Sequence, residues 1–505
     1  MSDITTDVLI VGAGLAGLYT ALNLDARLRC LIVTKEGVEL TASWLAQGGI
    51  AAAISADDTP QFHLEDTLRA GAGLCDEQAV RALVDDGPTE VARLRDWKVP
   101  FDLNEEGELH ITREGGHTHN RIVHAGGDAT GRETVKVLAA LSLERPNISY
   151  LSGAFLVDLL LHDGRVCGAQ VYDGGVRRIF AGAVVLCTGG CGQLYEHTTN
   201  PAAATGDGVA AALRAGAALS GMEFVQFHPT ALYSAFPESR AFLISEAVRG
   251  EGGRLVSKRG ERFMATQHPM GDLAPRDIVA RGIVREMRES REPCVYLDVT
   301  DKPAGFLAAR FPTIFNECAR RGLDISVNRI PVCPAQHYMV GGIRTGLCAE
   351  TTLPGLYAVG ENACTGVHGG NRLASNSMLE CLVYGRRAAR HIGDSLGGTG
   401  KLPSAGGPPS CPHAVLELLD PAAIQAEIRR LMERDCSVTR TERGLARGLA
   451  IIRALLSPVD HVPEEPTALR KDIWECRNLA QVAERILCAA LLRRESAGCH
   501  YREEY

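Results

Sequence analysis

The first residues of the chain alternate apolar runs with turn-forming positions in a way that predicts a strand, a tight turn and a helix. The apolar run 7–11 meets the glycine-rich segment 12–17, and a helical pattern follows over residues 18–28. A second apolar run at 30–34 lies at the distance expected for the next parallel strand of a βαβ unit. The chain is therefore expected to open as an α/β nucleotide-binding fold.

Later apolar runs predict further strands. Residues 153–161 and 166–172 flank a hairpin-like Asp-Gly turn, and the run 183–190 ends in a second glycine turn. Residues 355–360 return to the same pattern much later in the chain.

Two stretches interrupt this pattern. Between about 222 and 338 the chain becomes charged and contains prolines, with helices expected at segments such as 275–288, so an inserted domain is predicted. Residues 397–412 are rich in Gly, Pro and Ser and are typical of a linker, whereas 415–500 show helical periodicity with Arg and Glu at the polar positions. A small C-terminal helix bundle is expected.

Composition narrows the class of protein. The chain has 505 residues, of which 45% are hydrophobic and 23% charged, as in an ordinary globular protein. Its net charge of -8 argues against a surface that holds nucleic acid or anionic membrane, although a local basic pocket is compatible with it. No apolar run approaches the ~18 residues that span a bilayer. We therefore expect no membrane partner. Because no secretory signal precedes the 16 cysteines, we also expect a cytoplasmic location.

The segment 12–17 has the spacing of a dinucleotide-binding turn. Gly12, Gly14 and Gly17 would let the backbone turn tightly and approach a pyrophosphate at a helix N-terminus. A plain strand-to-helix turn is the alternative. NAD and FAD share this fingerprint, and Lys35 or Glu36 at the end of the second strand could meet the adenosine half of either.

Three other segments favour FAD. Residues 43–49 could wrap a flavin edge with backbone donors, Asp207 lies in a turn suited to ribityl hydroxyls, and Glu361 ends a strand in a similar way. Each segment by itself could equally be a structural turn.

Cationic or cationisable side chains recur beside Pro or Gly in segments that we expect to be loops. His228, His337 and Arg372 are the main examples, and together they would form an anion pocket in which Arg clasps a carboxylate. Satisfied structural histidines are the alternative. Arg249 and Arg276 also have carboxylates nearby, for which ordinary helix-start ion pairs are the alternative.

The spacing of Cys187 and Cys191 fits neither a CxxC motif nor an iron–sulfur pattern, so a structural role is expected. No histidine and cysteine grouping has zinc spacing, and no metal site is expected.

Several motifs follow one another in a family-specific order. Besides the glycine fingerprint they are 46–49, 117–132, 199–201, 206–208, 226–230, 246–253, 275–277, His337 and 368–385. In this order they resemble the succinate dehydrogenase and fumarate reductase flavoprotein family, most closely its L-aspartate oxidase branch. The resemblance covers nearly the whole chain.

The resemblance implies an α/β fold in which a Rossmann-like FAD-binding domain is interrupted by an α+β capping domain and followed by a C-terminal helical bundle. The expected parts are 1–221 and 339–406 for the FAD-binding domain, 222–338 for the capping domain and 407–505 for the helical domain.

Two positions are expected to separate the branches of the family. The respiratory enzymes carry a histidine that bonds covalently to FAD where this chain has Ala42, so FAD is expected to be held non-covalently. Glu114 matches a glutamate that pairs with the substrate ammonium in aspartate oxidases. Aspartate differs from succinate by that positive charge, which needs a partner.

The implied reaction is the oxidation of L-aspartate to iminoaspartate, with O2 reduced to H2O2 or fumarate reduced to succinate. This is the first step of NAD synthesis from aspartate, and it implies a functional link to quinolinate synthase.

The family's functional residues carry over to matching positions of this chain. Arg276 would be the acid/base, with Glu246 and Arg249 as a proton relay, although a guanidinium scarcely deprotonates and an electrostatic clamp is the alternative. Substrate-binding positions would be Glu114, His228, Ser245, His337 and Arg372. FAD-binding positions would be Gly12, Ala13, Gly14, Leu15, Ala16, Gly17, Lys35, Ala42, Ser43, Trp44, Leu45, Ala46, Gln47, Gly48, Gly49, Asp207, Glu361, Ser377 and Met378.

Two rival functions remain open from the sequence. A fumarate reductase or succinate dehydrogenase subunit would turn over succinate, ignore aspartate and need an iron–sulfur partner. A non-catalytic FAD-binding protein, or a flavoprotein that modifies RNA, is disfavoured by the acidic net charge and the anion pocket.

Overall fold

The structure is a computed structural model that describes residues 3–236, 238–397, 420–456 and 471–504. A seven-stranded sheet lies at its centre, in the order β6-β2-β1-β9-β8-β7, with β16 paired to β9. Its strands are β1 (Ile4–Val11), β2 (Cys30–Thr34), β6 (Ile148–Ser152), β7 (Phe155–His162), β8 (Arg165–Tyr172), β9 (Val176–Leu186) and β16 (Leu356–Ala358). The pairs formed by β6, β2, β1, β9 and β16 are parallel, and β7 to β9 form an antiparallel meander.

Successive residues of β1 point into two different cores. Val8 and Ile10 pack into the core on one face of the sheet, whereas Leu9 and Val11 pack into the core on the other. This period of two in an almost fully apolar run is what a strand covered on both faces requires.

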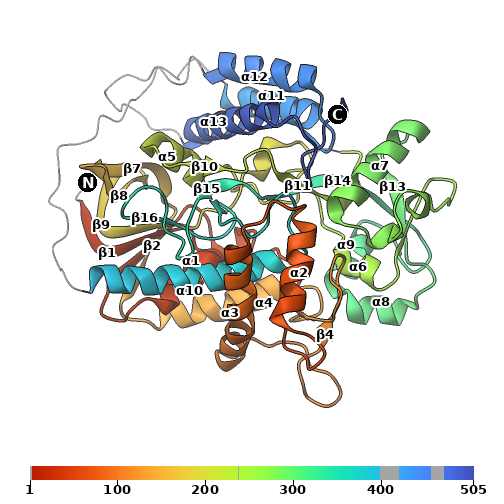
Figure 1. The fold of residues 1–505 in the computed structure, drawn as a ribbon, viewed down its shortest axis with the longest axis horizontal. Helices are drawn as coiled ribbons and strands as arrows, with labels where there is room; N and C mark the ends of the chain where they lie inside the picture. Colours follow the sequence, from red (N-terminus) through yellow and green to blue (C-terminus); the bar gives the residue numbers. More distant parts are fainter. Residues whose placement is uncertain (1–2, 237, 398–419, 457–470, 505) are drawn as a thin grey trace.

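Helices cover both faces of the sheet (Figure 1). One face packs against α1 (Leu15–Asn23), α3 (Glu77–Asp96), α4 (Thr130–Leu143) and α10 (Asn376–Leu396), with α2 (Pro60–Ala70) beside α3. The other packs against α5 (Asp207–Ala215), α11 (Pro421–Asp435), α12 (Glu442–Leu456) and α13 (Lys471–Leu492). Helices far apart in the sequence therefore share the two faces of one sheet.

Residues 225–339 build a second sheet with its own hydrophobic core. Its strand order is β11-β14-β13-β12, from β11 (Val225–Leu232), β12 (Arg254–Val256), β13 (Val295–Asp298) and β14 (Ile330–Met339). The helices α6 (Glu246–Gly250), α7 (Arg276–Ser290), α8 (Ala304–Arg310) and α9 (Pro312–Arg320) lie within the same stretch. With the two-faced sheet and the C-terminal helices, this confirms the expected fold class.

Two small three-stranded sheets complete the strands of the described residues. Strand β5 (Ile122–Val123) pairs with β3 (Ile50–Ala51) and β4 (Ile111–Thr112), and β15 (Gly342–Arg344) pairs with β10 (Leu219–Ser220) and β17 (Ala363–Cys364). None of the helices in the described ranges is both long and apolar enough to cross a membrane.

The structure corrects two local expectations. The first helix spans Leu15–Asn23, not 18–28, because Gly14 serves as its N-cap and Leu24 already has an extended backbone. His228 and His337 lie on strands β11 and β14 and not in loops. The prolines beside them are tolerated because the register shifts between His228 and Ala231, where ladder hydrogen bonds are interrupted.

Most of the expected linker 397–412, and the expected boundary at 406, fall on residues outside the described ranges.

Candidate functional site

The turn between β1 and α1 leaves no room for side chains. A Cβ on Gly12 would lie 2.1 Å from the carbonyl oxygen of Cys187, and one on Gly17 would lie 2.0 Å from the carbonyl oxygen of Gly12. Gly12 also has a φ of +112°, which favours glycine. The N-terminal end of α1 borders the cavity described next. A helix N-terminus that faces a cavity in this way is suited to bind a pyrophosphate.

A long cavity extends from Lys35, past this turn, to the N-terminus of α10. Its two adjoining parts enclose about 760 and 1180 Å³, open mouths included, and share Gly14 and Ser43 in their walls. The smaller part reaches Lys35 and Asp207, and the larger part reaches Arg372. The glycine turn thus lies where the two parts meet.

The structure brings most of the expected FAD-binding positions into the walls of this cavity. They are Gly12, Ala13, Gly14, Leu15, Ala16, Lys35, Ala42, Ser43, Leu45, Ala46, Gln47, Gly48, Gly49, Asp207, Glu361, Ser377 and Met378. Gly17 and Trp44 do not line it. Gly17 packs against the backbone of Gly12, and Trp44 packs on the hydrophobic core beside α1.

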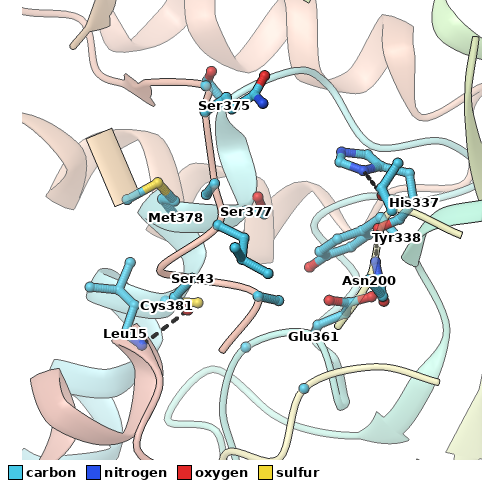
Figure 2. Close-up of a pocket in the computed structure, with 18 of the residues that line it drawn as sticks. Leu15, Ser43, Asn200, His337, Tyr338, Glu361, Ser375, Ser377, Met378 and Cys381 are labelled. Carbon is cyan, nitrogen blue, oxygen red and sulfur yellow. Dashed lines mark hydrogen bonds between the residues drawn. The ribbon is translucent and has the colours of Figure 1, made fainter. Parts of the chain in front are cut away.

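The walls of the larger part fit the polar edge and polyol chain of FAD. Gln47 has a buried side-chain oxygen with no hydrogen-bond partner, and Glu361 also lines the cavity, where its Oε1 accepts the Met339 N–H at 2.9 Å. Burial raises the pKa of Glu361 to about 7, so this carboxyl can exchange hydrogen bonds with hydroxyls. Figure 2 shows Ser377 and Met378 on one side of the cavity, with Glu361 on the other.

The N-terminus of α10 gives this cavity a positive end. Ser377 and Met378 belong to its first turn and line the cavity, and no side chain caps the helix. A helix of 21 residues presents unpaired N–H groups and partial positive charge there, which suits an anionic reduced ring system.

Lys35 and Asp207 lie together at the far end of the smaller part. Lys35 Nζ is 2.7 Å from Asp207 Oδ2 and 2.9 Å from Glu475 Oε1 of α13, and Asn478 of the same helix donates to Asp207 at 2.9 Å. Asp207 therefore lies in the wall of the smaller part, and its oxygens bond to Lys35, Thr205 and Asn478.

At the other end of the cavity, Arg276 and Glu246 form a buried ion pair. Arg276 is the first residue of α7, and its Nε lies 2.5 Å from Glu246 Oε2 on α6. Arg249, one turn later on α6, approaches the other oxygen of Glu246 at 3.1 Å but does not line the cavity. Burial alone would raise the pKa of Glu246, but the two guanidinium groups outweigh it and the pKa is lowered.

Two histidines face each other across β11 and β14, of which His228 is buried and His337 half-buried. The rings of His228 and His337 meet edge to face with centroids 5.0 Å apart, and both line the cavity. Burial, reinforced by Arg276 and Arg372, lowers the pKa of both well below 6.5. The histidines are therefore neutral hydrogen-bonding groups at neutral pH. His228 Nδ1 accepts the Thr230 N–H at 3.2 Å, which leaves the proton on Nε2.

Arg372 is a buried cation without a carboxylate. Its guanidinium lies 4.3 Å from the ring centroid of Tyr338, its Nη1 donates to Ser377 Oγ at 3.1 Å, and its Nε has no partner. Among the described residues it forms no ion pair. Burial, and then Arg276, lowers its pKa to about 10, so it stays charged at neutral pH. An unpaired buried guanidinium of this kind is suited to a carboxylate ligand.

Glu114 places a carboxylate against this cationic wall. It is 4% exposed, and its Oε2 accepts a hydrogen bond from Ser375 Oγ at 2.6 Å. Burial and the nearby Glu246 raise its pKa. Ser245 also lines the cavity, but its hydroxyl already caps α6 by accepting the Ala247 N–H. The site can therefore hold a molecule with carboxylates and one amine.

Other residues of the wall carry no role from the sequence argument. In the larger part they include Thr199, Asn200, Arg240, Leu243, Tyr338 and Ser375. Thr199 and Asn200 lie in one of the family-specific motifs and Tyr338 follows His337, whereas no local signal marks Arg240. The described residues contain no group of three or more His, Cys, Asp or Glu side chains able to hold a metal ion.

Comparisons with known proteins give consistent relatives. Residues 7–378 match a family model described as FAD binding domain, and 425–505 match one described as fumarate reductase flavoprotein C-term. An L-aspartate oxidase of Streptomyces coelicolor is 45% identical over 99% of this chain and 89% of its own length, and one of Pseudomonas aeruginosa is 44% identical over 99% and 95%. The solved structure of Escherichia coli quinol fumarate reductase is 32% identical, with a TM-score of 0.89 over 99% of this chain and 92% of that one.

Proposed function

Because this chain belongs to the FAD-binding flavoprotein family of the L-aspartate oxidases and fumarate reductases, we propose that its cavity oxidises L-aspartate to iminoaspartate. O2 is then reduced to H2O2, or fumarate to succinate. This reaction is the first step of NAD synthesis from aspartate.

The observation that carries this proposal is the position of Glu114. A pocket for a dicarboxylate needs only cations such as Arg276 and Arg372, which are both buried here. A buried carboxylate in the same pocket costs free energy unless the ligand brings a positive charge. Aspartate brings its ammonium group, whereas succinate does not.

FAD, when bound, supplies the acceptor for the hydride that leaves the substrate Cα. The chain would hold it between the glycine turn, the segment 42–49, Glu361 and the start of α10. Ala42 offers no nucleophile, which supports non-covalent binding. Acid precipitation should therefore release all the flavin into the supernatant, whereas flavin retained in the pellet would contradict this expectation.

The substrate would be held from several elements. Arg372 and the neutral His228 and His337 would bind its carboxylates, and Glu114 its ammonium. Ser245 would add a hydroxyl contact. We propose that Arg276 acts mainly as an electrostatic clamp, because a guanidinium paired at 2.5 Å with Glu246 does not give up its proton at neutral pH.

The product imine is the kind of compound that a quinolinate synthase consumes, and a coupled assay with that enzyme would test a functional link between the two proteins.

Every cysteine in the described part of the chain is a free thiol, which supports a reducing compartment such as the cytoplasm.

The decisive experiment is anaerobic reduction of the FAD-loaded protein. L-aspartate and succinate are mixed with it separately, and the visible flavin band is followed. Bleaching by L-aspartate, reversed by air with release of H2O2, is expected. Bleaching by succinate alone would instead assign the chain to the respiratory branch.

Glu114→Gln tests the ammonium pairing. We expect kcat/KM for aspartate to fall by about 10- to 100-fold, the value of one charge-assisted hydrogen bond, while fumarate reduction changes by less than about threefold. Glu106→Gln removes the same charge from the exposed surface and should leave both activities unchanged. Equal losses with both substrates would rule out the pairing.

The pH dependence has a defined sign. Only the ionised form of Glu114 can pair with an ammonium, and its pKa is raised above 4.5 by burial. The KM for aspartate is therefore expected to rise as the pH falls from neutral toward that raised pKa. The Glu114→Gln variant should lack this rise, and steady-state assays across the range would show it.

A further inference from the structure

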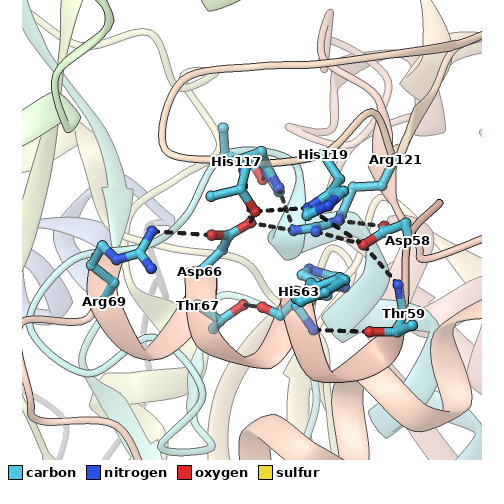
Figure 3. Close-up of polar contacts among 12 residues, drawn as sticks. Asp58, Thr59, His63, Asp66, Thr67, Arg69, His117, His119 and Arg121 are labelled. Atoms are coloured by element: carbon cyan, nitrogen blue, oxygen red, sulfur yellow. Dashed lines mark hydrogen bonds and ion pairs between the residues drawn. The ribbon is translucent and has the colours of Figure 1, made fainter. Parts of the chain in front are cut away.

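A buried polar cluster surrounds Arg121, Asp58 and Asp66 (Figure 3). Arg121 is fully buried and forms two hydrogen bonds to Asp58, at 2.7 and 2.8 Å, and one to Asp66 at 2.7 Å. Asp66 also accepts the backbone N–H and the hydroxyl of Thr118 at 2.8 Å each. These contacts anchor residues 118–121 to the start of α2, outside the walls of the cavity.

His117 connects this cluster to α10. Its Nδ1 lies 3.2 Å from Arg121 Nη1, and its Nε2 lies 3.0 Å from the carbonyl oxygen of Ala374. A guanidinium only donates, so Nδ1 accepts and Nε2 carries the proton that it donates to Ala374. Burial lowers the pKa of His117 to about 4, so the ring is neutral at physiological pH.

The segment that starts α10 is held at three consecutive residues. His117 binds the carbonyl of Ala374, and the Ala51 N–H donates to the carbonyl of Ser375 at 3.2 Å. The side chain of Asn376 contacts His63 Nε2 at 2.8 Å and donates to Thr67 Oγ1 at 3.1 Å. Ser375 is thereby kept at a φ of +60°, a conformation that is rare for a non-glycine residue.

This conformation aims the Ser375 hydroxyl at the Glu114 carboxylate, which it meets at 2.6 Å. His117 also acts on Glu114 directly, because its backbone N–H donates to the carbonyl of Glu114 at 3.2 Å. One residue therefore holds both partners of the Glu114–Ser375 hydrogen bond: the carboxylate through its backbone, and the hydroxyl through its ring.

We propose that His117 is a positioning residue that sets the place of the Glu114 carboxylate in the cavity and thereby the preference for an amine-bearing dicarboxylate. This inference rests on the proposed function. His117 does not line the cavity and touches neither substrate nor cofactor there. It acts through Ala374, Ser375 and Glu114, and the carboxylate-binding Arg372 has its own supports in Tyr338 and Ser377.

The test compares two substitutions at position 117. In His117→Gln the amide nitrogen can reach the place of Nε2 and keep the bond to Ala374. In His117→Asn the amide reaches only the place of Nδ1, so that bond is lost. The readout is the ratio of kcat/KM for aspartate oxidation to kcat/KM for fumarate reduction, measured on FAD-saturated protein.

We expect His117→Asn to lower this ratio by about tenfold, the size of one buried hydrogen bond, and His117→Gln to lower it by less than about threefold. His124→Gln is the matched control, because His124 is an equally buried neutral histidine that bonds Thr112 instead of α10. It should leave the ratio unchanged. Parallel losses of both activities, or identical behaviour of the Asn and Gln variants, would overturn the proposal.

Ser375→Gly covers the case in which His117→Asn does not fold. Glycine suits the positive φ at this position, so the backbone is relaxed while the hydroxyl is removed. The same fall in the ratio is expected, and an unchanged ratio would count against the proposal. A wild-type protein that does not oxidise aspartate at all would overturn the proposed function itself, which separates the two failures.

Discussion

At the scale of single residues, the two buried carboxylates of the site have opposite surroundings. Glu246 is held between Arg276 and Arg249, which lowers its pKa, whereas Glu114 accepts a hydrogen bond from the Ser375 hydroxyl and has a pKa raised by burial and by Glu246. Glu246 therefore compensates protein charge, and Glu114 is left for a charge on the ligand. The two should differ in how their loss affects different substrates.

Glu246→Gln is expected to damage both reactions. It leaves Arg276 and Arg249 buried beside a neutral amide, so we expect a loss of about 3–5 kcal/mol in the free energy of unfolding. We also expect aspartate oxidation and fumarate reduction to fall together by about 100-fold or more, because the clamp is misplaced for both substrates. Chemical denaturation and the two steady-state assays measure these effects. A loss confined to aspartate would contradict the clamp.

At the scale of elements, the end of β2 meets α13 at the adenosine side of the cavity. Lys35 follows β2 and is enclosed by Asp207 at the start of α5 and by Glu475 of α13. Burial would lower the pKa of Lys35, but the two carboxylates outweigh it, so the amine stays charged. The C-terminal helices thus contribute charge directly to the expected cofactor site.

Lys35→Met is expected to weaken FAD binding. It leaves Asp207 and Glu475 without their common cation, so the dissociation constant for FAD should rise by about tenfold or more. A fluorescence titration with FAD measures this without catalysis. Lys471→Met removes a neighbouring ion pair between α13 and Glu36 in which both side chains are more than a third exposed, and it should change the affinity less than about twofold. Equal effects of the two variants would contradict a special role for Lys35.

At the scale of the whole molecule, several histidines are buried in the neutral form. Burial lowers the pKa of His117 to about 4 and that of His124 to about 3, and it lowers those of His63, His228 and His337 well below 6.5. In the unfolded chain these groups take up protons near pH 6.5. Their contribution to stability is therefore complete above pH 6.5 and is lost as the pH falls toward their folded-state pKa values.

The protein should accordingly lose stability steeply between pH 6.5 and 5. His117 and His124, with pKa values of about 4 and about 3, each remove about 2 kcal/mol over this interval. Glu361 and Glu114 oppose the trend, since their raised pKa values make the folded state take up protons as the pH falls, but they are two groups against these five histidines. Denaturation of the wild type and of His124→Gln at both pH values tests this, and the loss should be about 2 kcal/mol smaller in the variant. An equal loss in both proteins would refute the assignment.

Features that depend on near neighbours in the chain follow from the amino-acid sequence alone. The glycine turn at 12–17, the apolar strand 30–34 and the helical C-terminus follow from steric freedom, side-chain alternation and helical periodicity, and the structure shows all three. Local pattern was weaker where strands carry proline, so His228 and His337 were expected in loops. Their strands form because each pairs with a partner about 100 residues away, which no local signal reveals.

Which buried charges meet depends on the three-dimensional packing of the chain. Glu114 and Ser375 are 261 residues apart, and Lys35 and Glu475 are 440 apart. The partner of a buried charge is set by the order of strands in the sheet and by which helix ends face the same cavity, and periodicity does not encode these. For the same reason the role of His117 emerges only when the loop after Glu114 and the start of α10 are seen in contact.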